Sequence, residues 1–483
     1  KVGNCEMDES LRERFKAEVR AMRAWTYLGM TMTFGKVPLI TEVLDYNSPN
    51  IPRDEVSVIR DFIMKELTEA AAILPEKYAG GYPNEKGRIT KYACLSLKAR
   101  AALYFGDYAL AESTAKEVMD KGGFSLFKIS SLSDAQKKEA EEMSLYIDFA
   151  EKGIDKDEFV KGMFNYEALW HTENANPDNP EYIMTRQYAA SSWNYQDMTR
   201  YTSMRPNQLG GWSSVTPTQN LLDAYWGVDG HSVPQLPTPE ERAKAYNQIK
   251  ADLDAYQKPE GEAKFIAFCQ EKIKNGTLKD YKYIQEFRNR DSRMYVSILM
   301  PFKSWYESNY GDKFVYEWIK NGNNESKTGF NFRKMLSLEN DANGDGQATG
   351  DYPCIRYAEI LLIYAEAHTQ TTGYDAATEA ALNQLRDRCG MPDVPSGLSK
   401  EEGLKLIQNE RRIELAGEGF RGDDMTRYSD DYWKEHMNNV PIMTPDGDTE
   451  LTMKWSSRMR LKPIPQTAID LNPLLAGDQN PGY

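Results

Sequence analysis

The sequence predicts a mainly α-helical protein, a scaffold of tetratricopeptide-like helical hairpins that carries a loop-rich subdomain. Two observations support this fold class. At both ends of the chain, long segments place apolar residues at helical spacing and are joined in pairs by short turns that contain glycine. Between them, about residues 125–343 are rich in Asn, Gly, Pro, Ser and Tyr, a composition typical of ordered loops with short helices and strands.

Four helices are expected in the N-terminal part. In the first, Ser10 and Glu13 have the spacing of a capping box, which would satisfy backbone donors at the helix start. The third and fourth are joined by a Gly-Asp-Tyr turn, and the small residues Ala99 and Ala102 let them approach closely, as in tetratricopeptide repeats. The apolar positions of the first helix are Phe15, Val19, Met22 and Trp25. The four expected helices cover residues 8–33, 54–74, 90–105 and 108–121.

The hairpin pattern recurs near the C-terminal end. Pro353 is expected in the first turn of a helix that continues through IRYAEILLIYAEA, because proline is tolerated at a helix start. A Gly-Tyr-Asp turn then leads to a second helix, for which Gly390 is the expected C-cap. Ser399 and Glu402 are expected to cap a further helix.

Charged residues in and after that further helix are expected to be structural. Arg411, Arg412 and Glu414 lie beside apolar neighbours, which favours buried ion pairs within the scaffold over a charged site. Asp423 and Asp424 follow a glycine and are expected in a loop or a cap. Adjacent carboxylates cannot flank one bond as the two carboxylates of a glycosidase do.

Composition excludes several classes of function. The 483-residue chain has a formal net charge of −14, which disfavours binding to phosphate backbones, so no nucleic-acid partner is expected. The four His are scattered and the five Cys form no CxxC pair, so neither a His-rich metal site nor a disulfide framework is predicted. No nucleophile, phosphate-loop or dinucleotide-binding motif appears.

Because KVGNCEMDES runs straight into a helix, we expect that a segment upstream is missing.

Aromatic residues in polar surroundings are the first candidate binding residues. Tyr and Trp present a flat apolar face and a polar edge, which suits sugar rings, while core packing is the alternative for each of them. The segment SSWNYQDMTRY interleaves aromatic and hydrogen-bonding residues, and KSWYESNYGDK forms a second polar aromatic cluster. A tryptophan after Gly210 and Gly211 is either exposed or a loop anchor. The candidate residues are Trp193, Asn194, Tyr195, Asp197, Arg200, Tyr201, Trp212, Trp305, Tyr306 and Tyr310.

An acidic segment at residues 340–352 is the second candidate site. Its spacing matches the front of a calcium loop, in which alternating oxygen side chains surround a hard cation and a glycine permits the sharp turn. A simple acidic turn is the alternative. No cofactor is required by this interpretation, and a bound calcium ion would be structural. The candidate ligands are Asp341, Asn343, Asp345, Gln347 and Asp351.

Six segments in collinear order resemble one family over essentially the whole chain. Three lie in the C-terminal part: YPCIRYAEILLIYAEA, NERRIELAGEGFRGDDMTRY and the terminal LKPIPQTAIDLNPLLAGDQNPGY. The others are ESLRERFKAEVRAMRAWTYLGMTMTFGKVPLIT, GGWSSVTPTQNLLDAYWGVDG and DSRMYVSILMP. Together they resemble the SusD-like proteins of the RagB/SusD family.

The resemblance implies a tetratricopeptide-like scaffold with a loop-rich ligand-binding subdomain, arranged as residues 1–124, 125–351 and 352–483 of one compact unit. It also implies a non-enzymatic protein of the Gram-negative cell surface that captures oligosaccharides for a SusC-like TonB-dependent transporter. The family's lipid-anchored cysteine lies upstream of the first helix, so the anchor in the outer membrane is not part of this sequence. Two alternatives stay open: a helical repeat scaffold that binds a peptide or protein, and an all-α glycosidase with two carboxylates across a cleft.

Overall fold

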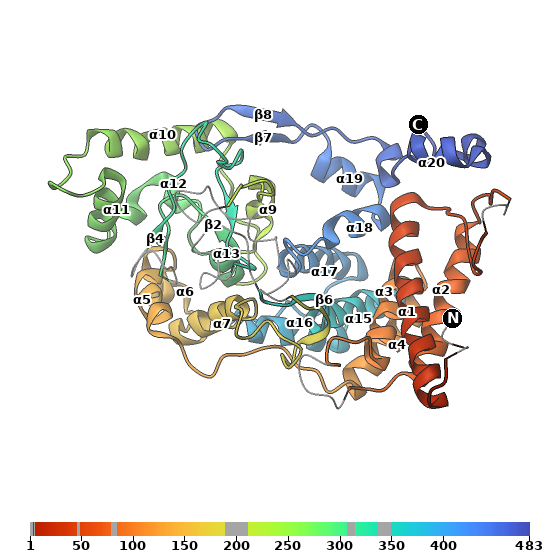
Figure 1. The fold of residues 1–483 in the computed structure, drawn as a ribbon. Coiled ribbons are helices and arrows are strands. Elements are labelled where there is room, and N and C mark those ends of the chain that lie inside the picture. Colours follow the sequence, from red (N-terminus) through yellow and green to blue (C-terminus); the bar gives the residue numbers. More distant parts are fainter. Residues whose placement is uncertain are drawn as a thin grey trace.

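Helical hairpins form one side of the molecule, and shorter helices and strands form the other (Figure 1). The computed structural model describes residues 3, 5–45, 49–78, 85–188, 211–306, 314–336 and 349–483. The N-terminal helices are α1 (Glu9–Phe34), α2 (Val56–Ile73), α3 (Lys91–Tyr104) and α4 (Tyr108–Lys121). After a long excursion the chain returns with α15 (Tyr357–Thr371), α16 (Ala376–Arg388) and α17 (Lys400–Glu414).

These helices form one continuous stack although the sequence divides them. Each of α1 to α3 packs against the next helix, α4 packs against α15, and α15 packs against both α16 and α17. A single hydrophobic core runs through the stack from Ala17 to Leu415. The predicted scaffold of helical hairpins is therefore confirmed, and the long middle segment is an insertion between two parts of it.

Helix α1 was predicted correctly in position but not in its cap or its buried face. Its N-cap is Asp8, whose carboxylate accepts a hydrogen bond from the Leu11 N–H at 3.1 Å, so the expected Ser10–Glu13 capping box is wrong. Helix α1 packs against α2, and its buried face begins with the small residues Ala17, Ala21 and Ala24 and continues with larger ones such as Leu28 and Met32. The larger Val19 and Met22 are 67% and 43% exposed. Alanine on the inner face lets the helix backbones approach closely.

The segment around Pro353 is a strand rather than the start of a helix. Strand β6 (Tyr352–Arg356) pairs antiparallel with β1 (Tyr182–Arg186), and α15 begins only at Tyr357. Both strands of a two-stranded sheet are edge strands, where a proline without an N–H is tolerated. The other C-terminal predictions are confirmed: Gly390 follows α16 with a positive φ of 65°, and Ser399 forms a capping box with Glu402 at the start of α17.

The middle segment has its own hydrophobic core, built largely from aromatic residues between Met143 and Leu336. Cys389, Met391 and Ile413 of the helical scaffold belong to this core, which joins the insertion to the scaffold. Its helices are α5 (Asp134–Glu142), α6 (Phe149–Lys152), α7 (Lys156–Ala168), α9 (Gln219–Ala224), α10 (Pro239–Ala255), α11 (Lys264–Lys274), α12 (Lys282–Gln285) and α13 (Ser292–Ser297). Its short antiparallel strands are β2 (Ile298–Leu299) with β5 (Asn331–Phe332), and β3 (Ser304–Trp305) with β4 (Phe314–Val315).

The chain then crosses back over the insertion. Helices α18 (Phe420–Arg427) and α19 (Asp430–Met437) lead to the hairpin of β7 (Pro441–Met443) and β8 (Thr449–Thr452), which lies above α9 and α10 (Figure 1). Helix α20 (Gln466–Leu471) brings the C-terminus to the top of the N-terminal helices, where Arg53 donates to Asn480 at 2.9 Å.

A buried network of ten charged side chains links the insertion to the scaffold, each at most 1% exposed. Glu414 is at its centre: it accepts from Arg356 at 2.8 Å and from Arg293 at 3.0 Å, and it also binds Arg388. The five carboxylates match the five cations, so no net charge is buried. The network consists of Glu181, Asp291, Glu410, Glu414 and Glu418 with Arg293, Lys334, Arg356, Arg386 and Arg388.

The neighbouring charged residues are structural as expected, with one correction. Arg411 is buried and bound to Asp424 at 2.9 Å, and Arg412 donates to the Asn220 carbonyl oxygen at 2.9 Å. Asp423 and Asp424 were expected in a loop or a cap but lie within α18, because Asp424 points inward to pair with Arg411 and Arg427.

His368 connects three scaffold helices and predicts a pH-dependent stability. Its ring nitrogens lie 2.8 Å from Glu112 of α4 and 3.1 Å from Asp375, the N-cap of α16. Burial lowers the His368 pKa, but the hydrogen bonds to these two carboxylates outweigh it and raise the pKa above the usual 6.5. The stabilisation is therefore complete below about pH 6.5 and is lost as the pH rises through the raised pKa.

We expect His368→Gln to unfold at lower denaturant concentration than the unchanged protein at pH 6, with the difference shrinking by pH 8.5. Urea titrations at both pH values, followed by circular dichroism, measure this. An equal difference at the two pH values would show that the charge of His368 contributes nothing.

Candidate functional site

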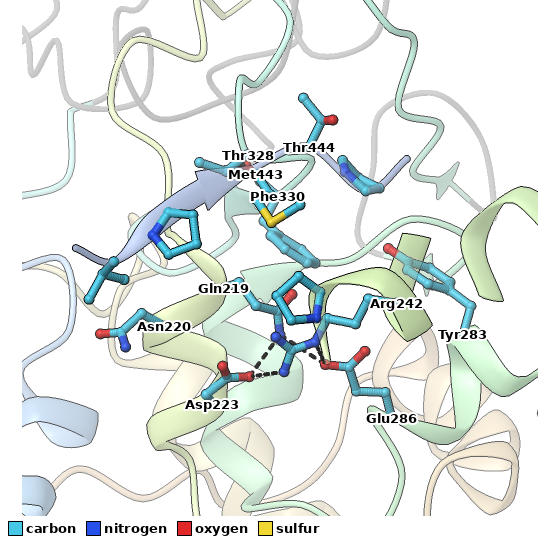
Figure 2. Close-up of a pocket in the computed structure, with 14 residues that line it drawn as sticks. Gln219, Asn220, Asp223, Arg242, Tyr283, Glu286, Thr328, Phe330, Met443 and Thr444 are labelled. Carbon is cyan, nitrogen blue, oxygen red and sulfur yellow. Dashed lines mark hydrogen bonds and ion pairs between the residues drawn. The ribbon is translucent and has the colours of Figure 1, made fainter. Parts of the chain in front are cut away.

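A pocket of about 200 Å³ opens between the insertion and the hairpin that crosses it (Figure 2). Helices α9 and α10 form its floor, the segment around Phe330 forms one wall, and strand β7 with the turn after it forms the roof. The pocket is lined by Gln219, Asn220, Asp223, Pro239, Arg242, Tyr283, Glu286, Thr328, Phe330, Val440, Pro441, Met443, Thr444 and Pro445.

Local sequence signals set the floor of the pocket. Thr238 forms a capping box with Glu241, and Pro239 occupies the first turn, so α10 begins just before Arg242. In α9, Gln219 and Asp223 are four residues apart and therefore lie on the same face of the helix.

The roof is held by contacts with the insertion. Lys320 pairs with Asp446 at 2.6 Å and with Asp448 at 2.7 Å, which ties the turn of the hairpin to the segment below it. At Gly329 the φ is +81°, and a side chain there would meet Pro445 at 2.1 Å. Only glycine allows this close approach without strain.

An ion-pair cluster lies at the base of the pocket (Figure 2). The Arg242 guanidinium donates from Nε to Glu286 at 2.6 Å and from Nη2 to Asp223 at 2.8 Å. The Gln219 amide donates to the same two carboxylate oxygens, at 2.8 Å to Asp223 and 3.0 Å to Glu286. Within the cluster, Asp223 accepts hydrogen bonds only at Oδ1, and Glu286 accepts them only at Oε1. The second oxygen of each carboxylate, Oδ2 of Asp223 and Oε2 of Glu286, accepts no hydrogen bond from the described residues.

Burial sets the protonation of both carboxylates. It raises the pKa of Glu286 to about 7, although Arg242 opposes the shift. It also raises the pKa of Asp223, against the attraction of Arg242 and the hydrogen bond from Gln219. The site therefore changes its charge near neutral pH.

Tyr283 adds a hydrogen-bonding group that the protein leaves unused. Its side chain is buried, and none of the described residues hydrogen-bonds to its hydroxyl. Figure 2 shows the ring at the edge of the pocket with the hydroxyl directed inward. Phe330, Met443 and the prolines supply apolar surface close by. A ligand with both hydroxyl groups and an apolar C–H face would match this combination.

Only three of the ten predicted binding residues can be placed. Trp212 is 41% exposed and lies seven residues before Gln219, the first residue of α9. Trp305 is only 1% exposed, so it offers no face to a ligand, contrary to the expected platform. Tyr306 is half-buried and bound to Glu142. The other seven lie outside the described residues: Trp193, Asn194, Tyr195, Asp197, Arg200, Tyr201 and Tyr310.

Sequence reasoning did not find the pocket. Asp223, Arg242 and Glu286 are far apart in the sequence and form no local motif. The spacing of Gln219 and Asp223 on α9 and the capping box at the start of α10 were local signals, and they could not reveal the partners on other helices.

The predicted calcium ligands are also mostly unplaced. Asp341, Asn343, Asp345 and Gln347 lie outside the described residues. Asp351 is buried and accepts from the Tyr188 N–H at 3.2 Å and from the Thr185 hydroxyl at 3.4 Å. Within the described ranges, no three His, Cys, Asp or Glu side chains are grouped so as to hold a metal ion.

No described helix is both long and apolar enough to cross a membrane.

Two curated relatives match the chain. "SusD-like protein P2" of Formosa agariphila is 29% identical over 148 residues, which cover 29% of this chain and 28% of that protein. "SusD-like protein P38" of the same organism is 22% identical over 428 residues, which cover 86% of this chain and 66% of that protein. The chain thus spans less than two thirds of the length of each relative.

Solved structures and a family profile agree with these relatives. A SusD-like protein of Bacteroides fragilis is 26% identical with a TM-score of 0.71, covering 100% of this chain and 82% of its own. A SusD-like carbohydrate binding protein of the same species has 21% identity and a TM-score of 0.65, covering 97% and 81%. A laminarin binding SusD-like protein has 20% identity and a TM-score of 0.57, covering 100% and 82%. The profile of the SusD family matches residues 180–483, more than half of the sequence. The chain belongs to the SusD family.

Proposed function

We propose that this protein is a glycan-binding protein of the cell surface, and that it captures oligosaccharides and delivers them to a SusC-like TonB-dependent transporter without hydrolysing them. The single observation that carries the proposal is the pocket under the β7–β8 hairpin, where apolar surface lies beside open carboxylate oxygens and an unpartnered tyrosine hydroxyl. Sugars present C–H faces and hydroxyls together, so both kinds of surface are used.

Relatives support the ligand class. One solved neighbour is described as carbohydrate binding and another as laminarin binding. The proposal extends this ligand class to the present chain, and it places the protein at the outer membrane through an N-terminal lipid anchor upstream of this sequence. The SusC-like transporter is proposed as the partner because the chain is a member of the SusD family.

Isothermal titration calorimetry against a panel of plant, host and microbial oligosaccharides tests the proposal, with laminarin oligosaccharides as the first probe. Binding without release of reducing sugar is the expected result. If no oligosaccharide in the panel binds and peptides do, the result would favour the alternative of a peptide-binding repeat scaffold. Product formation would show an enzyme instead.

Tyr283→Phe is expected to weaken binding of the best oligosaccharide about fivefold, because one hydrogen bond contributes about 1 kcal/mol. The variant should fold normally, since no residue in the described part of the chain hydrogen-bonds to the hydroxyl. Tyr108→Phe, on helix α4 of the scaffold, is the matched control and should bind as the unchanged protein does. Equal affinities for all three proteins would place the ligand outside this pocket.

We further propose a structural calcium ion bound with the help of Asp351. Burial raises the pKa of Asp351 to about 6, so ionisation of this carboxyl costs stability as the pH rises through that value unless a cation is present. Calcium should raise the melting temperature of the protein at pH 7.5, measured against EDTA, and Asp351→Asn should abolish this rise. A melting temperature that does not respond to calcium would favour the simple acidic turn.

A further inference from the structure

The β7–β8 hairpin, which roofs the pocket, lacks an apolar attachment to the structure beneath it (Figure 1). No residue from 438 to 454 belongs to a hydrophobic core cluster of the described part of the chain. All four residues of β8 are exposed, and its apolar side chain, Leu451, is 52% exposed. An element with few buried apolar contacts separates from its surroundings at a cost well below that of global unfolding.

The tip of the hairpin is held by one lysine of the insertion. Lys320 Nζ lies 2.6 Å from Asp446 and 2.7 Å from Asp448, and the Lys320 side chain is 41% exposed. We call these two ion pairs the latch. The Asn247 amide adds a long hydrogen bond of 3.5 Å to the Asp446 carbonyl oxygen. Because exposed ion pairs are weak and are screened by salt, the latch can break without disturbing a hydrophobic core.

Two further contacts at the tip involve glycine and therefore do not interlock. Gly329 lies against Pro445, and Gly447 lies so close to α10 that a β-carbon at position 447 would be 2.7 Å from the β-carbon of Ala243. A glycine has no side chain that inserts between its neighbours. Surfaces of this kind part without any side chain having to leave a socket.

The base of the hairpin, by contrast, is anchored. The Asn439 N–H donates to the Met453 carbonyl oxygen at 2.9 Å, and the Asn439 side-chain oxygen accepts from Lys454 at 2.6 Å. Just beyond the base, Trp455 packs beside Trp433 in a small hydrophobic cluster. An anchored base and a weakly held tip are the two parts of an element that moves about a hinge.

The closed pocket is small for a ligand of several sugar rings. Its volume of about 200 Å³ is below the ~300–1,000 Å³ that is typical of small-molecule sites. Strand β7 and the turn after it cover the pocket, so movement of the hairpin would both widen the space and open a way in.

We propose that the β7–β8 hairpin is a hinged roof, latched by Lys320, that lifts to admit a ligand and closes over it. Lys320 does not line the pocket, so it controls entry without contacting the ligand. This role goes beyond the proposed function, because it concerns entry to the pocket whatever ligand the pocket takes.

A buried reporter thiol tests the motion without any glycan. Thr328 lines the pocket, is 4% exposed and precedes Gly329, which touches the roof at Pro445. Thr328→Cys is combined with Cys5→Ser, which removes the exposed thiol of Cys5. The protein is treated with N-ethylmaleimide, and modification at position 328 is followed over time by mass spectrometry of its peptide. The reagent reaches this thiol when the roof is lifted.

Lys320→Gln breaks the latch and should speed the modification at position 328 about fivefold at low salt. Lys250→Gln is the matched control and should leave the rate unchanged, because Lys250 is an exposed lysine that pairs within its own helix with Asp254 at 2.6 Å. Raising the salt to about 1 M should speed the reaction when the latch is intact, and much less in Lys320→Gln, since screening weakens only ion pairs that are present. Equal rates for the two lysine variants, or a rate that does not respond to salt when the latch is intact, would overturn the hinged roof.

Discussion

Replacing Glu414 by alanine is expected to cost about 3–5 kcal/mol, the usual effect of removing one partner from a buried ion pair. Glu414 contacts the guanidinium groups of Arg293, Arg356 and Arg388, all of them buried. Without the carboxylate, three cations would remain in the interior with too few anions. Since proteins have typical unfolding free energies of about 5–15 kcal/mol, much of the stability would be lost. Soluble yield and urea denaturation at pH 7 measure the effect.

The control is Glu401→Gln on the same helix. Glu401 pairs with Lys405, and both side chains are exposed, so we expect a change within about 0.5 kcal/mol. Because its arginine partners hold the Glu414 pKa well below the usual range despite burial, the stabilisation is present above about pH 4.5 and is lost at lower pH. If Glu414→Ala unfolded at the same urea concentration as Glu401→Gln, the network would be structurally unimportant.

Trp305→Ala is expected to destabilise the fold by about 3–5 kcal/mol through the cavity that it leaves. Trp305 is almost fully buried in the core of the insertion, and the Arg333 guanidinium lies 4.9 Å from the centre of its ring. Arg333 also binds Glu167 at 2.5 Å and Glu139 at 2.6 Å, so loss of the indole would disturb a second buried ion-pair cluster.

Trp212→Ala provides the contrast, because a half-exposed indole contributes little to folding and should change stability by about 0.5 kcal/mol or less. Chemical denaturation of both variants, followed by oligosaccharide titration of the folded protein, distinguishes a core residue from a binding platform. If Trp305→Ala had normal stability but no longer bound the oligosaccharide, Trp305 would be a ligand-binding residue rather than a core residue.

Local signals in the sequence predicted the helices well because hairpin turns and caps involve neighbouring residues. The capping box of Ser399 with Glu402 and the glycine after α16 are examples. Features that depend on a distant partner were missed. Pro353 lies in a strand because β1, far away in the sequence, pairs with it, and α1 buries its alanines because α2 packs on that face.

The candidate site was harder to predict for the same physical reason. Asp223, Arg242 and Glu286 meet through side chains from three separate segments, and the roof of the pocket comes from a fourth near the C-terminus. Aromatic residues in polar sequence surroundings, by contrast, were a poor guide at Trp305. Its polar neighbours Lys303 and Ser304 are themselves buried, with Lys303 paired to Glu139 at 2.6 Å.

The division of the helical stack into two parts has a consequence for the order of events during synthesis. Helix α4 cannot be covered by α15 until residues 122–356 have also been made. At translation rates of about 5–20 residues per second, this interval lasts roughly 10–50 s. The N-terminal hairpins must wait that long with one side open, and contacts between such distant segments form slowly. Until α15 has been made, the side of α4 that it covers stays open to contacts with other chains.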